Sequence, residues 1–88
     1  MKLRKGFILR DVTGKTFVVA TGELSREFQG MITLNETGKF IWECLADDTT
    51  AEEIVEKMAK VYDEVEKDIL ERDVTAFINK MIEEKIVE

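Results

Sequence analysis

The residues that most often perform chemistry in proteins are scarce in this chain of 88 residues. It contains no histidine and one cysteine, Cys44. The commonest general base and the Ser–His or Cys–His nucleophile pairs are therefore absent. The sequence also has neither a GxGxxG loop nor a P-loop that could cradle a phosphate group. These absences argue against a hydrolase or a nucleotide-dependent enzyme and favour a binding protein.

Carboxylates are plentiful, but their setting does not indicate an active site. Neighbouring acids such as Asp47 and Asp48 are usually solvated on a small domain, and a transition metal would lack histidine or clustered cysteine ligands. Cys44 lies at helical spacing near Phe40 and Ile41, which is typical of a small core residue rather than a nucleophile. We expect no catalytic residue, no metal site and no cofactor.

The first third of the chain has the pattern of antiparallel strands. Residues 7–10 and 16–20 are rich in aromatic and β-branched types, and Thr13 and Gly14 between them predict a hairpin turn. Residues 24–29 read as a polar link. Residues 30–34 then alternate as a short third strand.

The remainder of the chain changes to helical periodicity. Asn35 is a candidate N-cap for a first helix, and Thr50 with Glu53 has the spacing of a capping box for a second. Asp63 with Glu66 is a weaker capping signal before a third helix over about residues 66–85. The predicted core stripe of that helix is Leu70, Val74, Phe77 and Met81. Ile78 and Ile82 flank this stripe on one side.

These elements predict one α+β domain over residues 1–88, in which three antiparallel strands precede three helices. A hydrophobic fraction of 44% with 36% charged residues fits a folded protein. The apolar runs are too short to span a membrane, and one cysteine allows no internal disulfide. We therefore expect a cytoplasmic protein.

An ordered set of short motifs covers the chain from about residue 5 to residue 88. It comprises the segment GMITLNETGKFIW at residues 30–42, a second helix from Thr50 to Tyr62, and Asp73-Val74 followed by Phe77-Ile78 on the third helix. This order and spacing resemble the PqqD-like family, which is named for a protein of pyrroloquinoline quinone synthesis.

The resemblance implies a winged helix-turn-helix-like domain that recognises ribosomally made, post-translationally modified peptides. In that family a leader peptide adds as a strand to the third β-strand and lies between that strand and the third helix. The bound precursor peptide is presented to a modifying enzyme, often a radical S-adenosylmethionine (radical SAM) protein. Carried onto this sequence, the binding strand consists of Gly30, Met31, Ile32, Thr33 and Leu34. The helical wheel offers Thr75, Ile78 and Ile82 for the opposing wall.

The hydrogen-bonding capacity of a free strand edge supports this mechanism, but a purely structural role for Ile78 and Ile82 is an alternative. A strand with an unpaired edge offers backbone donors and acceptors to a peptide, while side-chain pockets provide specificity. Ile78 and Ile82 could equally widen the contact of the third helix with the core. The chain also departs from the family where the third helix commonly ends in Gly-Leu, because it has Lys85 and Ile86 there. A different C-terminal turn is therefore expected.

Two other classes of function compete with peptide binding. Winged helices often bind DNA, which requires basic side chains opposite the phosphates. Residues 64–85 contain seven acidic and four basic side chains, so this helix would be repelled. A scaffold or homodimerisation domain without a peptide ligand is the other alternative, and the sequence does not separate it from a peptide-binding domain.

Overall fold

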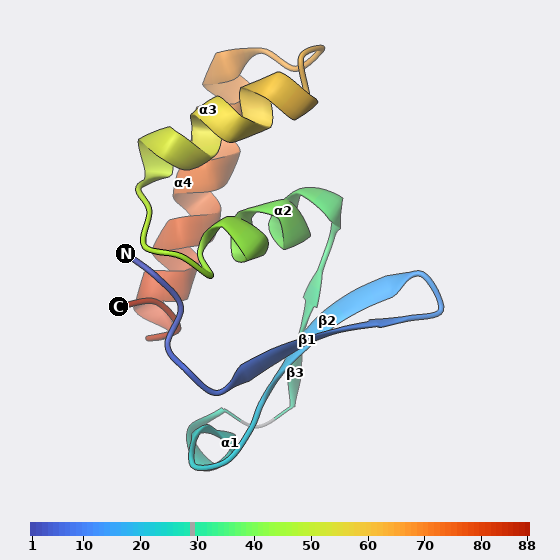
Figure 1. The fold of residues 1–88 in the computed structure, drawn as a ribbon, viewed down its shortest axis with the longest axis vertical. Coiled ribbons are helices and arrows are strands. Elements are labelled where there is room, and N and C mark those ends of the chain that lie inside the picture. Colours follow the sequence, from blue (N-terminus) through green and yellow to red (C-terminus); the bar gives the residue numbers. More distant parts are fainter. Residues whose placement is uncertain (29) are drawn as a thin grey trace.

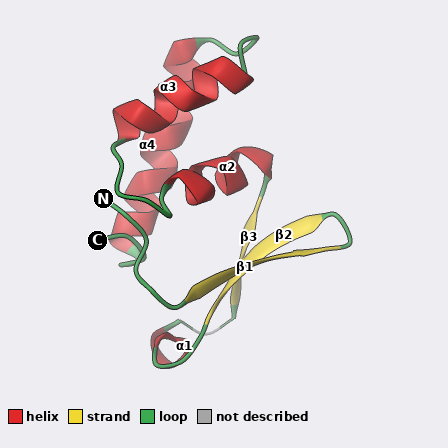
Figure 2. Ribbon diagram, viewed as in Figure 1, coloured by secondary structure: helices red, strands yellow, loops and turns green. Residues whose placement is uncertain are grey.

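The computed structural model describes residues 1–28 and 30–88, and it has an α+β, winged-helix-like architecture. A three-stranded sheet lies beside a group of helices, as Figures 1 and 2 show. The predicted fold class is confirmed. Among the described residues, no helix is both long and apolar enough to cross a membrane.

The hairpin forms where the sequence predicts it. Strands β1 (Phe7–Val12) and β2 (Lys15–Ala20) pair antiparallel, and Val12 lies opposite Lys15. The two turn residues, Thr13 and Gly14, have positive φ angles of 49° and 77°. Positive φ at both positions suits the tight turn whose twist matches that of the flanking strands.

Strand β3 (Met31–Leu34) begins one residue later than predicted and pairs antiparallel with β2. The strand order is β1-β2-β3, so within residues 1–28 and 30–88 one edge of β3 has no strand beside it. The expected polar link at residues 24–29 needs a correction, because Leu24–Glu27 form a short helix, α1. Gln29, the last residue of that predicted link, lies outside the described residues. Leu24 anchors α1 because its side chain is buried.

Two of the predicted helix starts are confirmed. Helix α2 (Glu36–Cys44) is capped by Asn35, whose Oδ1 accepts a hydrogen bond from the Gly38 amide at 2.8 Å. Helix α3 (Ala51–Val61) is capped by Thr50, whose hydroxyl accepts from the Glu53 amide at 3.2 Å. Half of the predicted capping box is missing, because the Glu53 carboxylate accepts a hydrogen bond from the Thr49 hydroxyl at 3.1 Å instead.

Helix α4 (Lys67–Glu83) departs from the prediction at both ends. Its N-cap is Glu66, which makes no side-chain cap, so the Asp63 capping signal is wrong. At its C-terminus Lys85 adopts a positive φ of 62°. The Ile86 amide donates to the Met81 carbonyl at 2.8 Å and the Lys85 amide to the Ile82 carbonyl at 3.0 Å. These two bonds define a Schellman turn, in which Lys85 occupies the left-handed position that glycine usually takes. The expectation that a non-glycine residue would change this turn is therefore wrong.

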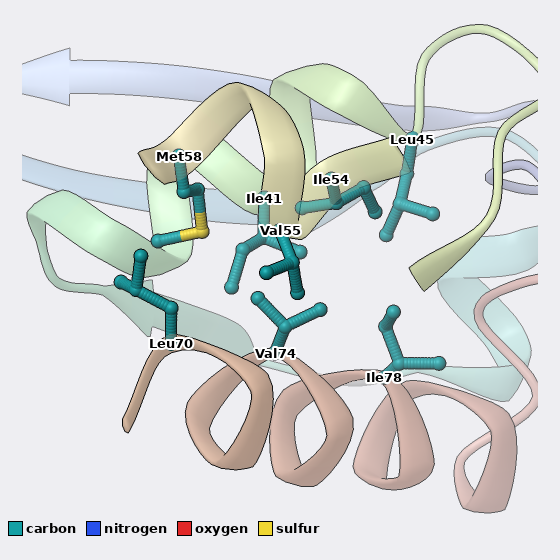
Figure 3. Packing of buried hydrophobic residues seen from close by; sticks show 8 residues of the cluster. All are labelled: Ile41, Leu45, Ile54, Val55, Met58, Leu70, Val74 and Ile78. Atoms are coloured by element: carbon teal, nitrogen blue, oxygen red, sulfur yellow. The ribbon is translucent and has the colours of Figure 1, made fainter. Parts of the chain in front are cut away.

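The core has two parts. The first holds the three long helices together, with a row of α4 side chains facing α2 and α3 (Figure 3). Its buried members are Ile41, Leu45, Ile54, Val55, Met58, Leu70, Val74 and Ile78. The second part joins the sheet to α2, to α4 and to the chain that follows α4. Its buried members are Val18, Leu34, Trp42, Met81 and Ile86.

The two ends of the described chain are tied together beside these helices (Figure 1). Leu3 forms an antiparallel bridge with Val87, and the backbones of Lys2 and Glu88 exchange hydrogen bonds of 2.9 and 2.8 Å. The Arg4 amide donates to the Ile86 carbonyl at 2.9 Å. The segment after α4 is thereby fixed in place next to the sheet.

Candidate functional site

A groove of about 1000 Å³ lies between β3 and α4. Its strand side includes the whole of β3 together with Gly30 and Asn35. The free edge of β3 therefore belongs to a hollow rather than to a flat surface. The groove brings together all five strand residues that were predicted for the site: Gly30, Met31, Ile32, Thr33 and Leu34.

The floor of the groove is apolar and partly aromatic. Phe7 and Phe28 line it, and their ring centroids lie 5.3 Å apart in an edge-to-face arrangement. Phe7 makes a second edge-to-face contact with Trp42 at 5.8 Å. These two edge-to-face contacts fix the orientation of the Phe7 and Phe28 rings, so the floor is preorganised for a ligand. Such a surface can bury apolar side chains of a ligand.

The helical wall of the groove is one flank of α4. Its residues are spaced i, i+3, i+4 and i+7, so they lie on one side of the helix. They are Phe77, Lys80, Met81 and Glu84. Met81 is buried against the sheet, Phe77 is half-buried, and the two charged side chains are exposed. The wall thus combines an apolar base with a charged rim.

The residues predicted for this wall lie elsewhere. Ile78 is 4% exposed and packs in the first core cluster against α2 and α3 (Figure 3). Thr75 is exposed and Ile82 is 53% exposed, and neither of them lines the groove. The prediction therefore placed the wall on the flank of α4 that faces away from this groove. At about 100° per residue these three positions lie on the opposite side of the Leu70–Val74 stripe from Phe77 and Lys80, and sequence alone does not say which side faces the sheet.

Several groove residues were missed in the sequence. Phe28 lies within the segment that was read as a polar link, and Phe7 was assigned only to a strand. A usable signal exists in α4, because apolar and charged residues share the flank of Phe77, Lys80, Met81 and Glu84. That mixture is more typical of a partly exposed wall than of a core stripe.

Arg4 braces one rim of the groove. Its guanidinium pairs with the Glu27 carboxylate at 3.3 Å and donates to the Lys85 carbonyl at 2.8 Å. The same group lies 5.9 Å from the centre of the Phe28 ring, within range of a cation–π contact. One side chain therefore links α1, the aromatic floor and the turn after α4.

A second charged contact joins the sheet to α2 outside the groove. The Asp11 carboxylate accepts hydrogen bonds from the Thr16 hydroxyl and from the Lys39 ammonium, the latter at 2.9 Å. These hydrogen bonds, with that of Thr16 the stronger influence, lower the pKa of Asp11, and the pairing with Asp11 raises the pKa of Lys39. Asp11 is exposed and Lys39 is half-buried, so this ion pair positions the hairpin at the surface of the protein.

Cys44 supplies the one thiol among the described residues. Within them no three histidine, cysteine, aspartate or glutamate side chains gather as a metal site. Cys44 is half-buried against the first core cluster, and burial raises the pKa of its thiol. A raised pKa makes the thiol a poorer nucleophile. The groove is suited to holding an extended chain by noncovalent contacts.

Comparison with known proteins gives two findings that agree with this geometry. The family described as Coenzyme PQQ synthesis protein D (PqqD) matches residues 7–87. A solved structure described as "TbiB1 in Complex with the TbiA(beta) Leader Peptide" matches with a TM-score of 0.77 and 20% sequence identity, over 100% of this chain and 95% of that chain. A search of the curated proteins gave no significant match.

Proposed function

This chain belongs to the family of Coenzyme PQQ synthesis protein D, and from that premise we propose that it binds the leader segment of a ribosomally made precursor peptide. The binding is noncovalent and the chain itself catalyses no reaction. The observation that carries the proposal is the groove, because it combines a free strand edge with an apolar floor and a helical wall.

The leader adds as a fourth strand beside β3. Its backbone pairs with the free edge, which supplies affinity with little dependence on sequence. Alternate side chains of an extended peptide point to opposite faces, so every second one is directed toward the floor formed by Phe7 and Phe28. Pairing on β3 also covers an exposed edge that would otherwise invite aggregation.

The neighbouring structure supports the same ligand class. TbiB1 is described in complex with a leader peptide, and its fold covers the whole of this chain. A shared fold at 20% identity does not transfer the ligand by itself. The proposal gains its weight from the coincidence of that fold with a groove that runs along β3 in this chain.

The bound precursor is then presented to a separate modifying enzyme. Leader binding leaves the downstream part of the precursor free, and tethering it to a partner raises its effective concentration at an active site. Within the family resemblance, a radical SAM enzyme is the class that we propose. The chain thus acts as a peptide chaperone for chemistry that occurs elsewhere.

Amide chemical-shift mapping tests this function. The ligands are synthetic leader peptides of ribosomally made precursors, each titrated into isotope-labelled protein. We expect the largest shifts at Met31–Leu34 and at Phe77, Lys80, Met81 and Glu84, with slowed amide exchange along β3. Shifts confined to α3 or to β1, or no binding at all, would contradict the proposal.

A further inference from the structure

The sheet has a second face, which meets the groove only at the edge strand β3, where Met31 and Thr33 line both. Val18 is 1% exposed, and its cross-strand partners Leu9 and Ile32 pack with it on the side of the helices. Because successive residues of a strand point to opposite sides, their neighbours lie on the side away from the helices. We call that side the outer sheet face. It consists of Ile8, Arg10, Val12, Lys15, Phe17, Val19, Met31 and Thr33.

Apolar side chains on this face form adjoining rows. Ile8, Val19 and Met31 are direct cross-strand partners, so they make one row across all three strands. Phe17 occupies the centre of the next row, and Val12 closes the face near the hairpin turn. Ile8, Val12 and Met31 are 37%, 50% and 61% exposed. Contiguous exposed apolar surface of this kind is typical of an interaction site.

The charges on this face have one sign. Its two charged residues are Arg10 and Lys15, both basic and exposed, whereas the whole chain has a net charge of −6. Neither of them takes part in an ion pair among residues 1–28 and 30–88. An acidic protein thus concentrates two free positive charges beside its exposed apolar rows. The complementary surface is apolar with carboxylates at its margin.

A second copy of the chain does not supply that complement face to face. A twofold interface on this face would bring Arg10 and Lys15 toward their own copies, and like charges in an interface are repulsive. The groove opens between β3 and α4, whereas the outer face points away from the helices. Met31 and Thr33 are shared with the groove, but Ile8, Arg10, Val12 and Lys15 do not line it, so a protein docked over these four residues leaves the groove accessible to a peptide.

We propose that the outer sheet face docks the modifying enzyme, through an apolar patch of that enzyme bordered by Asp and Glu side chains. This inference rests on the proposed function, since the enzyme is the partner that must be present while the groove holds the leader. The sheet then separates two tasks: one face and the β3 edge hold the peptide, and the other face holds the enzyme.

The test uses as its probe a purified radical SAM enzyme, chosen because it modifies a precursor whose leader this chain binds. Its affinity is measured for the wild-type chain, for Arg10→Glu/Lys15→Glu and for Val12→Ser. Two matched controls, Lys57→Glu/Lys60→Glu and Val61→Ser, carry the same changes on α3. Val61 is a fair match for Val12, because their exposed fractions are 59% and 50%. Leader binding by every variant is measured separately.

We expect the double charge reversal to weaken enzyme binding at least about tenfold at 0.15 M salt, and Val12→Ser to weaken it about threefold. Both controls should stay within about twofold of the wild type, and all variants should bind the leader normally. Equal loss in the α3 controls, no loss in the outer-face variants, or no enzyme binding by a chain that still binds the leader overturns the inference. Failure of the leader to bind the wild type instead overturns the proposed function. Dimerisation of the chain through the outer face, measured by sedimentation, would replace the enzyme with a second copy and also overturn it.

Discussion

Truncating Phe77 tests which flank of α4 faces the bound peptide. Phe77 is half-buried, and its ring lies near enough to Gly38 that a Cβ at that position would be 3.3 Å from Cε2 of Phe77. The remaining surface of the ring opens to the groove. Phe77→Ala removes this apolar wall and leaves the buried α4 side chains Leu70, Val74, Ile78 and Met81 in place.

The expected loss of affinity follows from the area that a peptide would cover. A phenylalanine side chain buries roughly 150–250 Å² in total, and most of the Phe77 ring is already covered, so about 60 Å² is left for a ligand. At about 25 cal/mol per Å² this area contributes up to about 1.5 kcal/mol, which corresponds to a loss of at most about twelvefold in Kd. The cost to the free energy of unfolding should be about 2 kcal/mol, because a fully buried phenylalanine loses about 3–5 kcal/mol on truncation.

Isothermal titration of the leader peptide measures the effect, and two variants serve as controls. Phe40→Ala makes the same substitution away from the groove, where Phe40 packs edge-to-face on Tyr62 at a centroid distance of 5.9 Å. It should lower the melting temperature comparably and leave Kd unchanged. Ile82→Ala truncates the exposed opposite flank and should change neither quantity appreciably. Weaker binding by Ile82→Ala with normal binding by Phe77→Ala would refute the assignment of the wall.

Four further outcomes are expected. Lys85→Gly should raise the free energy of unfolding by about 0.5–1 kcal/mol in urea titration, because Lys85 has a φ of 62° that glycine adopts without strain; a destabilised variant would show that other contacts of Lys85 outweigh the backbone term. Since burial raises the pKa of Cys44, its native thiol should react with a disulfide reagent at pH 8 much more slowly than the thiol of urea-unfolded protein, and equal rates would contradict its packing. The folded pKa of Asp11 is lowered below its ordinary value of 3.8, first by the Thr16 hydrogen bond and then by Lys39. The stability that Asp11 contributes is therefore present above pH 3.8 and is lost as the pH falls through the folded pKa. Below about pH 4, the melting temperature of Asp11→Asn should accordingly fall less steeply than that of the wild type. Duplex DNA should show no sequence-specific binding at about 0.15 M salt, and nanomolar affinity for any duplex would contradict the argument from the acidic charge of residues 64–85.

The amino-acid sequence determined those features of the fold that depend on neighbouring residues. Asn35 and Thr50 cap the helices that follow them because a side-chain oxygen needs only to reach an amide three residues away. The hairpin turn at Thr13 and Gly14 is likewise local. The resemblance to the PqqD-like family predicted Gly30 to Leu34 as the binding strand, and all five residues line the groove.

Features that depend on distant residues were decided by the tertiary structure. Lys85 takes the left-handed conformation that its residue type disfavours, and its segment is held by the Arg4 side chain and by pairing of Leu3 with Val87 from the other end of the chain. The short helix α1 forms where the link looked merely polar, because Leu24 finds a buried site there. Neither the contacts that hold the Lys85 segment nor the burial of Leu24 can be predicted from residues that are close in the sequence.

The helical wall of the groove shows the same limit most clearly. The apolar positions of α4 span a broad arc around the helix. Their periodicity identifies the buried stripe, but it does not distinguish the flank on one side of the stripe from the flank on the other. Ile78 lies on the side that packs against α2 and α3, whereas Phe77 and Lys80 lie on the side that meets the sheet. Which side becomes the wall depends on how α4 is rotated against two other elements at once. Packing of Met81 on the sheet and of Ile78 in the helical core sets that rotation, and only the tertiary structure contains both contacts.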